Sequence, residues 1–406
     1  MSLDTPVARR SLLLGGAGLA GTAATGLLGS GPASAAGAVL ARPDDDKGDG
    51  GRVRPLWKSA WHNGIVYGSD LATWQMDDQY RPFFHRQAAL MSFQDDLLWY
   101  VLKPTPTSPV SFRHSDRVME FAERNGQLVL GAPGLVWDEG FGDGWTDDDI
   151  WGLNRHQAQK LLYGVIRQTV HHYRGRMAGW IVCNEVTDPE GKHGVRTEFP
   201  WYQTIGPDFI ADSYHLVHEI DPHAELLINE FGFETVNKYG DRAVPRQRAM
   251  LQVIDKLLAQ KVPVHGLGIQ AHLNAHKFEE RFHEGHYLRF LKEVADRGLS
   301  IHITELDVAD SGLPKNHRLR DRGVADVYRR FLDTALQEKA VKTVINFGLT
   351  DRYNSLTEDN PRNDGLPRRP LPFNQKLQPK PAYDAISAAF RQAPHRHPLW
   401  TPPKAR

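Results

Sequence analysis

Short runs of apolar residues alternate along the chain with longer segments in which apolar residues recur every three or four positions. Apolar runs rich in β-branched residues and bounded by turn residues predict buried strands, and the longer periodicity predicts amphipathic helices. The predicted strands are residues 65–70, 88–94, 127–131, 179–185, 225–231, 264–272, 300–308 and 342–349. The predicted helices are residues 113–125, 154–173, 207–220, 245–260, 278–297 and 323–337, and a last helix that ends at residue 390.

This alternation predicts a (β/α)8 barrel, in which eight parallel strands close on themselves inside a ring of helices. An open doubly wound sheet is the alternative architecture. It is disfavoured because no glycine-rich phosphate-binding turn follows the first predicted strand. The 406 residues are enough for one such barrel, which takes about 250 residues or more, and for extensions.

The first 35 residues have the pattern of a targeting segment. Arg9 and Arg10 begin a twin-arginine motif, a region rich in Gly, Ala and Leu follows, and residues 33–35 (ASA) form an A-x-A cleavage site. This pattern predicts export to the cell envelope or the exterior, and an uncleaved membrane anchor is the alternative. Residues 36–52 are predicted to be a flexible linker, residues 53–395 the barrel domain and residues 396–406 a C-terminal tail.

The overall charge excludes some classes of partner. Lysine plus arginine and aspartate plus glutamate both number 49, so no net field favours nucleic acid or an anionic membrane. We therefore expect no nucleic-acid partner and no membrane association after signal cleavage, and nothing in the sequence predicts an oligomeric state. The single cysteine, Cys183, excludes an internal disulfide. Because it lies inside a predicted strand, we expect a buried thiol that acts as a small apolar side chain.

Polar residues gather where the predicted strands end. In a barrel of parallel strands the carboxyl ends of the strands carry the chemistry, and Glu185 and Glu305 stand at two of these ends. The neighbouring strand-end residues are Asn184, Asn229, Glu230, Gln270, His272, Asp307 and Asp351. For each residue taken alone, the alternative is a solvated loop residue or a polar group of the barrel interior with its hydrogen bonds satisfied. Two glutamates on separate strands are what glycoside hydrolysis requires.

The chemistry sets different demands on the two carboxyl groups. A general acid needs a pKa raised by burial or by a nearby negative charge, whereas a nucleophile must stay ionised among hydrogen-bond donors. His272 could donate to Glu305, and Asn184 could hold a sugar 2-hydroxyl. Retention of configuration requires the carboxyl groups to be about 5–5.5 Å apart, and inversion requires about 6.5–9.5 Å.

The 19 histidines raise the alternative of a metal-dependent hydrolase or deaminase. His171 and His172 are adjacent on a predicted helix and point in different directions. His283 and His286 can share a helix face, but no carboxylate or cysteine set completes a site around them. We therefore expect no metal and no cofactor.

Six short motifs stand in order along the chain: residues 180–186 (WIVCNEV), 229–231 (NEF), 268–273 (GIQAHL), 303–308 (ITELDV), 348–353 (GLTDRY) and 378–383 (QPKPAY). Together they resemble the motifs of glycoside hydrolase family 10, the family of retaining endo-β-1,4-xylanases. The resemblance covers about residues 60–390. It implies a barrel that hydrolyses a β-linked carbohydrate with retention, Glu185 as acid/base and Glu305 as nucleophile, with Asp307 supporting the site.

The N-terminal third departs from the family pattern. The family usually has E-N-x-M-K-W after strand 2 and G-H-T-L-V-W-H on strand 3, whereas this chain has residues 95–100 (DDLLWY) and 131–138 (GAPGLVWD). Phe347 replaces the tryptophan that opens the strand-8 motif. In the family these positions hold the sugars on the glycone side, so Asp95, Asp96, Trp137, Asp138 and Phe347 are expected to contact the substrate. The changes remove donors and add acceptors.

Three functions remain open at this point. The first is a retaining β-glycosidase, with xylan as the default substrate. Its altered glycone residues could instead favour exo action or another sugar, such as one with a cationic or unusually hydroxylated glycone. The second is a non-catalytic carbohydrate-binding barrel, and the third is the metal-dependent enzyme considered above.

Overall fold

The computed structural model describes residues 53–131, 135–235 and 242–401. The chain divides into two units, residues 1–54 and 55–406, and all the helices and strands named below belong to the second. The predicted signal peptide and almost all of the predicted linker lie outside the described residues, as do the last five residues of the predicted tail. Those assignments stay predictions.

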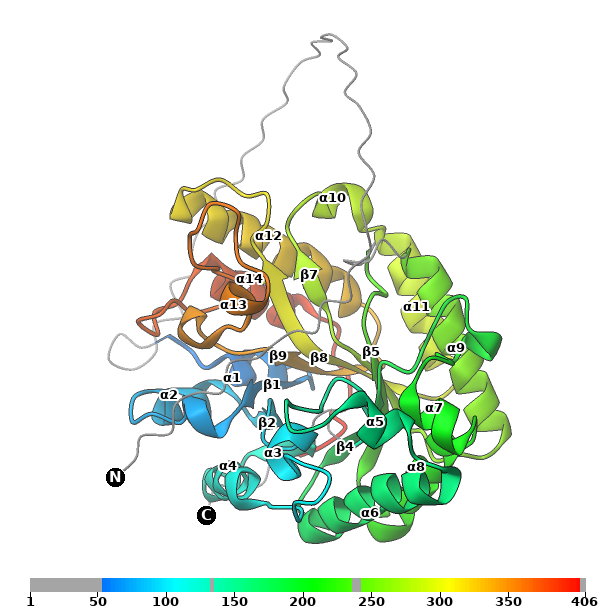
Figure 1. The fold of residues 1–406 in the computed structure, drawn as a ribbon. Coiled ribbons are helices and arrows are strands. Elements are labelled where there is room, and N and C mark those ends of the chain that lie inside the picture. Colours follow the sequence, from blue (N-terminus) through cyan, green and yellow to red (C-terminus); the bar gives the residue numbers. More distant parts are fainter. Residues whose placement is uncertain (1–52, 132–134, 236–241, 402–406) are drawn as a thin grey trace. The chain divides into compact units, whose positions relative to one another are not determined.

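Nine strands form one all-parallel sheet that closes on itself (Figure 1). They are β1 (Val66–Leu71), β2 (Leu90–Phe93), β3 (Leu128–Gly131), β4 (Gly179–Asn184), β5 (Glu225–Glu230), β6 (Gly266–Ile269), β7 (His272–Asn274), β8 (Ser300–Ala309) and β9 (Val341–Asn346). The order is β6-β5-β4-β3-β2-β1-β9-β8-β7, and a further pairing of β6 with β8 completes the barrel. The predicted (β/α)8 barrel is confirmed, and the open doubly wound sheet is wrong.

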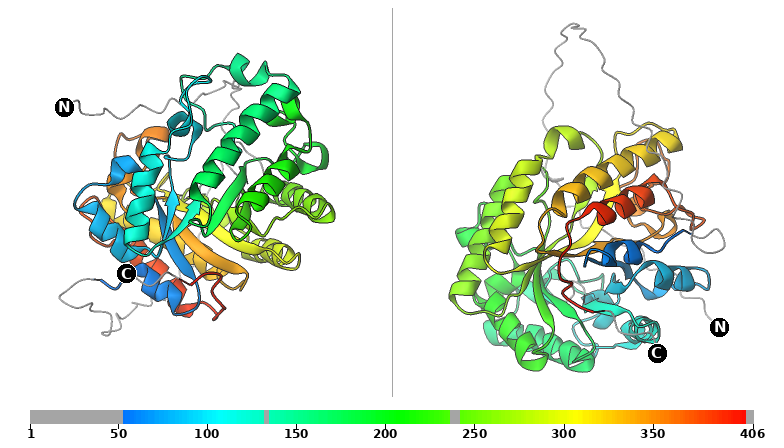
Figure 2. Two further views of the ribbon diagram at one scale, coloured as in Figure 1. Left: turned by 90° about the horizontal axis from the view of Figure 1, so that it is seen from below. Right: turned by 180° about the vertical axis from the view of Figure 1, so that it is seen from behind.

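Helices surround the strands on their outer side (Figures 1 and 2). The α-helices are α1 (Leu56–Trp61), α2 (Tyr80–Gln87), α3 (Trp99–Leu102), α4 (Arg113–Arg124), α5 (Asp147–Trp151), α6 (Arg155–Tyr173), α7 (Pro200–Ile205), α8 (Phe209–Ile220), α9 (Ala243–Ala259), α10 (Phe278–Arg281), α11 (Glu284–Ala295), α12 (His317–Ala335), α13 (Leu356–Asp359) and α14 (Pro381–Gln392). The longest begin at good caps: the Asn154 side chain accepts from the Gln157 amide at α6, and Asn316 caps α12.

Six apolar side chains, one from each of six strands, pack together in the core. They are Val66, Leu90, Leu130, Ile181, Leu227 and Ile345. Trp61 and Trp400 pack against them. A side chain of this size that is removed from water contributes about 1.5–3 kcal/mol. This layer holds the strand ends in a fixed frame for the site.

The strands that position the two predicted catalytic glutamates are irregular close to those residues: β4 just before Glu185, and β8 in the stretch that contains Glu305. In β4, Ile181 pairs with Leu227 and Cys183 pairs with Ile228, so Val182 is one extra residue relative to β5. In β8, an extra residue lies between Ile303 and Asp307 relative to β6 and β7, and the pairing with β9 shifts in the same stretch. Such bulges bend a strand and redirect its side chains, and they are common beside active sites.

The strand predicted at 264–272 is interrupted in the structure. It is split into β6 and β7 by Gln270 and Ala271, and Ala271 has a left-handed φ of 58°. A non-glycine residue in this region costs free energy and is found mainly where function demands the geometry. The kink lets Gln270 and His272 turn toward the barrel mouth.

Candidate active site

Glu185 stands directly after β4, at the mouth of the barrel. Its backbone is left-handed, with φ 56°, and its amide donates to the carbonyl of Asn229 on β5. Two side chains hold its carboxyl group: Gln270 Nε2 donates to Oε1 over 2.7 Å, and Trp137 Nε1 donates to Oε2 over 3.1 Å. The strained backbone and the two donors fix the direction of the carboxyl group.

The surroundings of Glu185 favour its protonated form. Burial of the carboxyl group, followed by the negative charges of Glu230 and Glu139, raises its pKa to about 8. The hydrogen bonds from Gln270 and Trp137 oppose this rise because they stabilise the carboxylate. At neutral pH most of the Glu185 population therefore carries a proton. That is the state that a general acid needs.

Glu305 lies in the middle of β8, within the bulge. Asn229 Nδ2 donates to its Oε1 over 2.8 Å, and His272 Nε2 lies 3.1 Å from its Oε2. Its amide donates to the carbonyl of Gln270, next to the kink. Donors on both oxygens stabilise a carboxylate, so this environment suits a group that reacts in its ionised form.

His272 joins two carboxylates of β8. It lies opposite Asp307 in the β7–β8 pairing, and its Nδ1 is 3.1 Å from Asp307 Oδ1. Desolvation would lower the pKa of His272, but the charges and hydrogen bonds of Asp307 and Glu305 raise it well above its usual value. A protonated His272 donates from both ring nitrogens, to Asp307 and to Glu305. The structure places Asp307, which was predicted to support the site, in contact with His272; its role stays a prediction.

Amide side chains connect the two glutamates. Asn229 Nδ2, which binds Glu305, also donates to Asn184 Oδ1 over 2.8 Å, and Thr304 fixes the other end of Asn229 through its hydroxyl, 2.7 Å away. Gln270, which binds Glu185, lies 3.4 Å from the same Asn184 oxygen. The structure therefore brings Asn184, Glu185, Asn229, Gln270, His272 and Glu305 into one hydrogen-bonded group, as the strand-end argument predicts.

Comparisons with known proteins bear on this group. Residues 56–389 match the sequence profile of glycosyl hydrolase family 10. This chain belongs to that family. It is a glycoside hydrolase, and the family predicted from the six motifs is confirmed.

Similar proteins of this family carry xylanase and exoglucanase names. It is 28% identical over 332 residues to an endo-1,4-beta-xylanase B of Thermotoga neapolitana, covering 80% of this chain and 87% of that protein. It is 28% identical over 325 residues to the exoglucanase XynX of Acetivibrio thermocellus, covering 76% of this chain but 27% of that much longer protein. The crystal structure of xylanase 10B from Thermotoga petrophila RKU-1 in complex with xylobiose has a TM-score of 0.72, 26% identity and covers 83% of this chain and 97% of that one.

The carboxylates that depart from the family 10 motifs are bound by the chain's own side chains. Asp96 accepts from both the amide and the hydroxyl of Thr73, each at 2.8 Å. Asp95 accepts from the indole nitrogen of Trp74 over 2.8 Å. Asp138 forms an ion pair with Arg196. At least one oxygen of each carboxylate is therefore bound within the chain, whereas Asp138 Oδ1 is buried without a hydrogen-bond partner among the described residues. The assignment of these carboxylates as substrate contacts stays a prediction.

Two aromatic residues stay close to the catalytic group. Trp137 binds Glu185 directly, as described above. The half-buried Phe347, which follows β9, packs edge-on against His272 with ring centroids 5.2 Å apart. Both residues therefore border the space beside the glutamates.

Asp351 is placed differently from the prediction. Its buried carboxylate is held by Lys380 at 3.1 and 2.9 Å and by the Leu371 amide at 3.1 Å. These contacts leave it no surface for a sugar, so its assignment as a substrate contact is corrected to a structural one. The lysine comes from the last of the six motifs, so the two C-terminal motifs bind each other.

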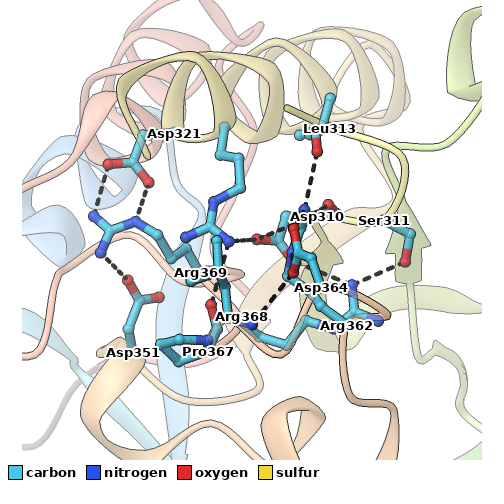
Figure 3. A network of polar contacts seen from close by, with 12 residues as sticks. Asp310, Ser311, Leu313, Asp321, Asp351, Arg362, Asp364, Pro367, Arg368 and Arg369 are labelled. Atoms are coloured by element: carbon cyan, nitrogen blue, oxygen red, sulfur yellow. Dashed lines mark hydrogen bonds and ion pairs between the residues drawn. The ribbon is translucent and has the colours of Figure 1, made fainter. Parts of the chain in front are cut away.

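Asp351 belongs to a larger set of ion pairs (Figure 3). Arg369 binds Asp321 of α12 through two bonds of 2.7 Å and approaches Asp351 at 3.9 Å. Beside it, Asp310 at the end of β8 meets Arg320, Arg362 and Arg368 at 3.1–3.5 Å. The network ties the segment after β9 to the segment after β8.

Three further residues lie near the site; the sequence placed Glu230 among the strand-end residues without a specific role and did not indicate the other two. Glu230, which is fully buried, accepts from the Thr187 hydroxyl and amide, and burial raises its pKa. Arg246 approaches it at 3.6 Å. Glu234 is buried near His272, and burial raises its pKa to about 7. The position of Glu230 beside Asn229 was a usable signal, but the other two lie outside any strand end.

The described residues contain no group of three or more histidine, cysteine, aspartate or glutamate side chains arranged to hold a metal ion. Of the histidines considered as ligands, His172 stacks on Phe112 and binds Asp116. In the same described ranges, none of the helices has both the length and the apolar composition needed to cross a membrane.

Proposed function

We propose that this chain hydrolyses a β-1,4-linked xylan-type polysaccharide or oligosaccharide by double displacement, with Glu185 as acid/base and Glu305 as nucleophile. One observation carries the assignment of roles. Glu185 has a pKa of about 8, whereas Glu305 receives a donor on each carboxylate oxygen. The two carboxyl groups thus differ as an acid and a nucleophile must differ.

In the first step Glu305 attacks the anomeric carbon while Glu185 protonates the departing oxygen, which leaves a covalent glycosyl ester on Glu305. Glu185, now ionised, then takes a proton from water, and the water oxygen displaces Glu305. Asn229 and His272 stabilise Glu305 before attack and when it leaves. The amide nitrogen of Asn184 bonds to no other residue in the described ranges, so it is available to a sugar hydroxyl.

The first experiment is hydrolysis of aryl β-glycosides, β-1,4-xylo-oligosaccharides and cello-oligosaccharides, with the product anomer followed by NMR. Cello-oligosaccharides are included because one relative bears an exoglucanase name. We expect β-xylosyl products with retained configuration. Turnover of glucosides alone would replace the xylan part of the proposal, and an inverted product would overturn double displacement.

Azide tests the two roles separately. In Glu305→Ala, azide can enter the space of the lost carboxylate and displace the leaving group once, which gives an α-glycosyl azide. In Glu185→Ala, azide attacks the glycosyl ester on Glu305 after a first inversion, which gives a β-glycosyl azide. The opposite assignment of products would exchange the roles of the two glutamates.

We also propose that the enzyme is exported by the twin-arginine route. The proposal rests on Arg9, Arg10 and the ASA sequence at residues 33–35. Arg9→Lys together with Arg10→Lys should keep the protein inside the cell, as measured by fractionation of an expressing bacterial host. Unchanged export of the double variant would contradict this route.

A further inference from the structure

Trp74 is a large aromatic side chain that this chain leaves in solvent. Its exposed fraction is 53%, the highest among the exposed large apolar side chains of the described residues. It lies in a short turn, Thr73–Gln75, that follows β1 by two residues. The turn therefore stands at the carboxyl end of the strands, the same end as Glu185 and Glu305.

Three consecutive side chains of this turn are bonded to three consecutive side chains after β2. The Thr73 hydroxyl donates to Asp96 at 2.8 Å, the Trp74 indole nitrogen donates to Asp95 at 2.8 Å, and Gln75 Nε2 donates to Gln94 Oε1 at 2.6 Å. The Gln75 amide oxygen also accepts from the Ala72 backbone at 2.8 Å. The turn is fixed at every position, and the indole orientation is fixed with it.

A second aromatic ring supports Trp74 from the segment after β9. Tyr353 packs edge-on against it, with ring centroids 5.7 Å apart and an angle of 83° between the planes. Tyr353 is itself held, because its hydroxyl binds Asp77 and its ring packs against Tyr80 at 5.0 Å. A rigid exposed ring loses little entropy when a ligand stacks on it.

The position of the turn indicates on which side of the cleaved glycosidic bond Trp74 lies. β1 is two strands from β8, which carries Glu305, and three strands from β4, which leads to Glu185. Phe347 after β9 lies between, in contact with His272. Glu185, as the acid, faces the leaving group, so the side nearer to Glu305 and farther from Glu185 receives the glycone.

We propose that Trp74 is a stacking platform for a pyranose ring of the glycone, at least one sugar away from the cut, and that Asp95 and Asp96 are positioning residues for it. The apolar face of a pyranose ring and an indole face are complementary because each is flat and carries C–H or π surface. This inference rests on the proposed function, since it assumes a β-linked chain that extends across the barrel mouth.

The test uses aryl β-xylosides with one, two and three xylosyl units. The aryl group occupies the leaving-group side, so each added sugar extends the glycone. We expect Trp74→Ala to lose kcat/KM progressively with length, with a loss about tenfold larger on the longest glycone than on the single xyloside, as for removal of an aromatic anchor. Trp74→Phe should recover much of this loss, and Asp95→Ala should show a milder loss with the same dependence on length.

Trp151→Ala is the matched control. This second exposed tryptophan, 44% exposed at the end of α5, should give no length-dependent loss. An equal loss by Trp74→Ala on all three glycones would overturn the platform and leave the proposed function intact. So would a loss confined to substrates lengthened on the leaving-group side.

Calorimetric binding of xylotriose to Glu305→Gln, with and without Trp74→Ala, separates the two proposals. If the parent shows no turnover but Glu305→Gln binds xylotriose and loses that binding in Trp74→Ala, the proposed function is overturned and the stacking platform is supported. Binding that is unchanged by Trp74→Ala would overturn the platform. Absence of both turnover and binding would overturn both.

Discussion

The indole nitrogen of Trp137 donates a hydrogen bond of 3.1 Å to Oε2 of Glu185. This bond favours the carboxylate and so works against the burial and the Glu230 charge that raise the Glu185 pKa to about 8. The pKa of Glu185 is therefore set by two opposing effects: burial and nearby charges raise it, and the hydrogen bonds from Trp137 and Gln270 lower it. Removing one of these hydrogen bonds should change how the activity depends on pH.

Trp137→Phe should move the alkaline limb of the pH profile upward. In the parent enzyme kcat/KM should fall as pH rises through about 8, because the acid loses its proton there. Without the indole donor the carboxylate is less stabilised, the pKa rises and the fall occurs at higher pH. The measurement is kcat/KM on an aryl β-glycoside from pH 5 to about 10.

Trp145→Phe is the control for this change. Trp145 also donates an indole hydrogen bond, but to the Lys103 carbonyl within a buried aromatic cluster. Its alkaline limb should coincide with that of the parent. A limb that stays in place or moves down in Trp137→Phe would refute the balance described for Glu185.

Asn229→Asp should slow turnover by about 10²-fold, since small misplacements of catalytic groups have effects of this order. The new carboxylate would face Glu305 Oε1 and Asn184 Oδ1, both of which now accept from Asn229. Asn363→Asp, at an exposed position, is the control, and equal kinetics in the two variants would contradict the bridging role.

His272 should remain protonated above its usual pKa near 6.5. Its pKa is raised in the folded state, so the stability that it contributes is fully present below about pH 6.5 and is lost as pH rises through the folded value. Asp307→Asn removes one of its two carboxylates and should lower this pKa. An imidazole titration followed by NMR with labelled histidine measures both values; an unchanged His272 pKa in Asp307→Asn would contradict the contact.

Asp310→Asn should destabilise the barrel by about 3–5 kcal/mol, the range for breaking a buried ion pair on one side. Asp310 is fully buried among Arg320, Arg362 and Arg368, whose positive charges would lose their common partner. Urea unfolding measures the difference. The exposed pair of Arg81 and Asp78 gives the control, because Asp78→Asn should change stability by less than about 1 kcal/mol. Equal losses of unfolding free energy in Asp310→Asn and Asp78→Asn would mean that the buried ion pairs stabilise the barrel no more than an exposed pair does.

The sequence was sufficient for the barrel and for the strands that carry its site residues. Continuous apolar runs located the strands that bring Glu185 and Glu305 to the barrel mouth, because parallel strands all run toward one side of a barrel. The predicted strand end at Glu305 was not found, since β8 continues to Ala309. The sequence was not sufficient for the extra residues in β4 and β8, since a bulge is a property of the pairing between strands, and their neighbours are far away in the chain.

The partners of three predicted site carboxylates could not be read from the sequence. Asp95, Asp96 and Asp351 stand at strand ends, but a strand-end position does not tell which partner a carboxylate has. Their partners, Trp74, Thr73 and Lys380, lie 21, 23 and 29 residues away, in turns and loops with no periodic pattern. A self-satisfied carboxylate and a substrate-binding one therefore look the same in the sequence.

Cys183, the only cysteine of the chain, is fully buried one residue before Asn184, and burial raises the pKa of its thiol well above the usual value. A thiol reagent reacts with the thiolate, so labelling requires β4 to open and expose this residue. The rate of labelling therefore measures how often the strand that leads to Glu185 opens. A glycan that binds only the closed barrel should lower the rate of Cys183 labelling, and the rate should fall further as more of the barrel is occupied.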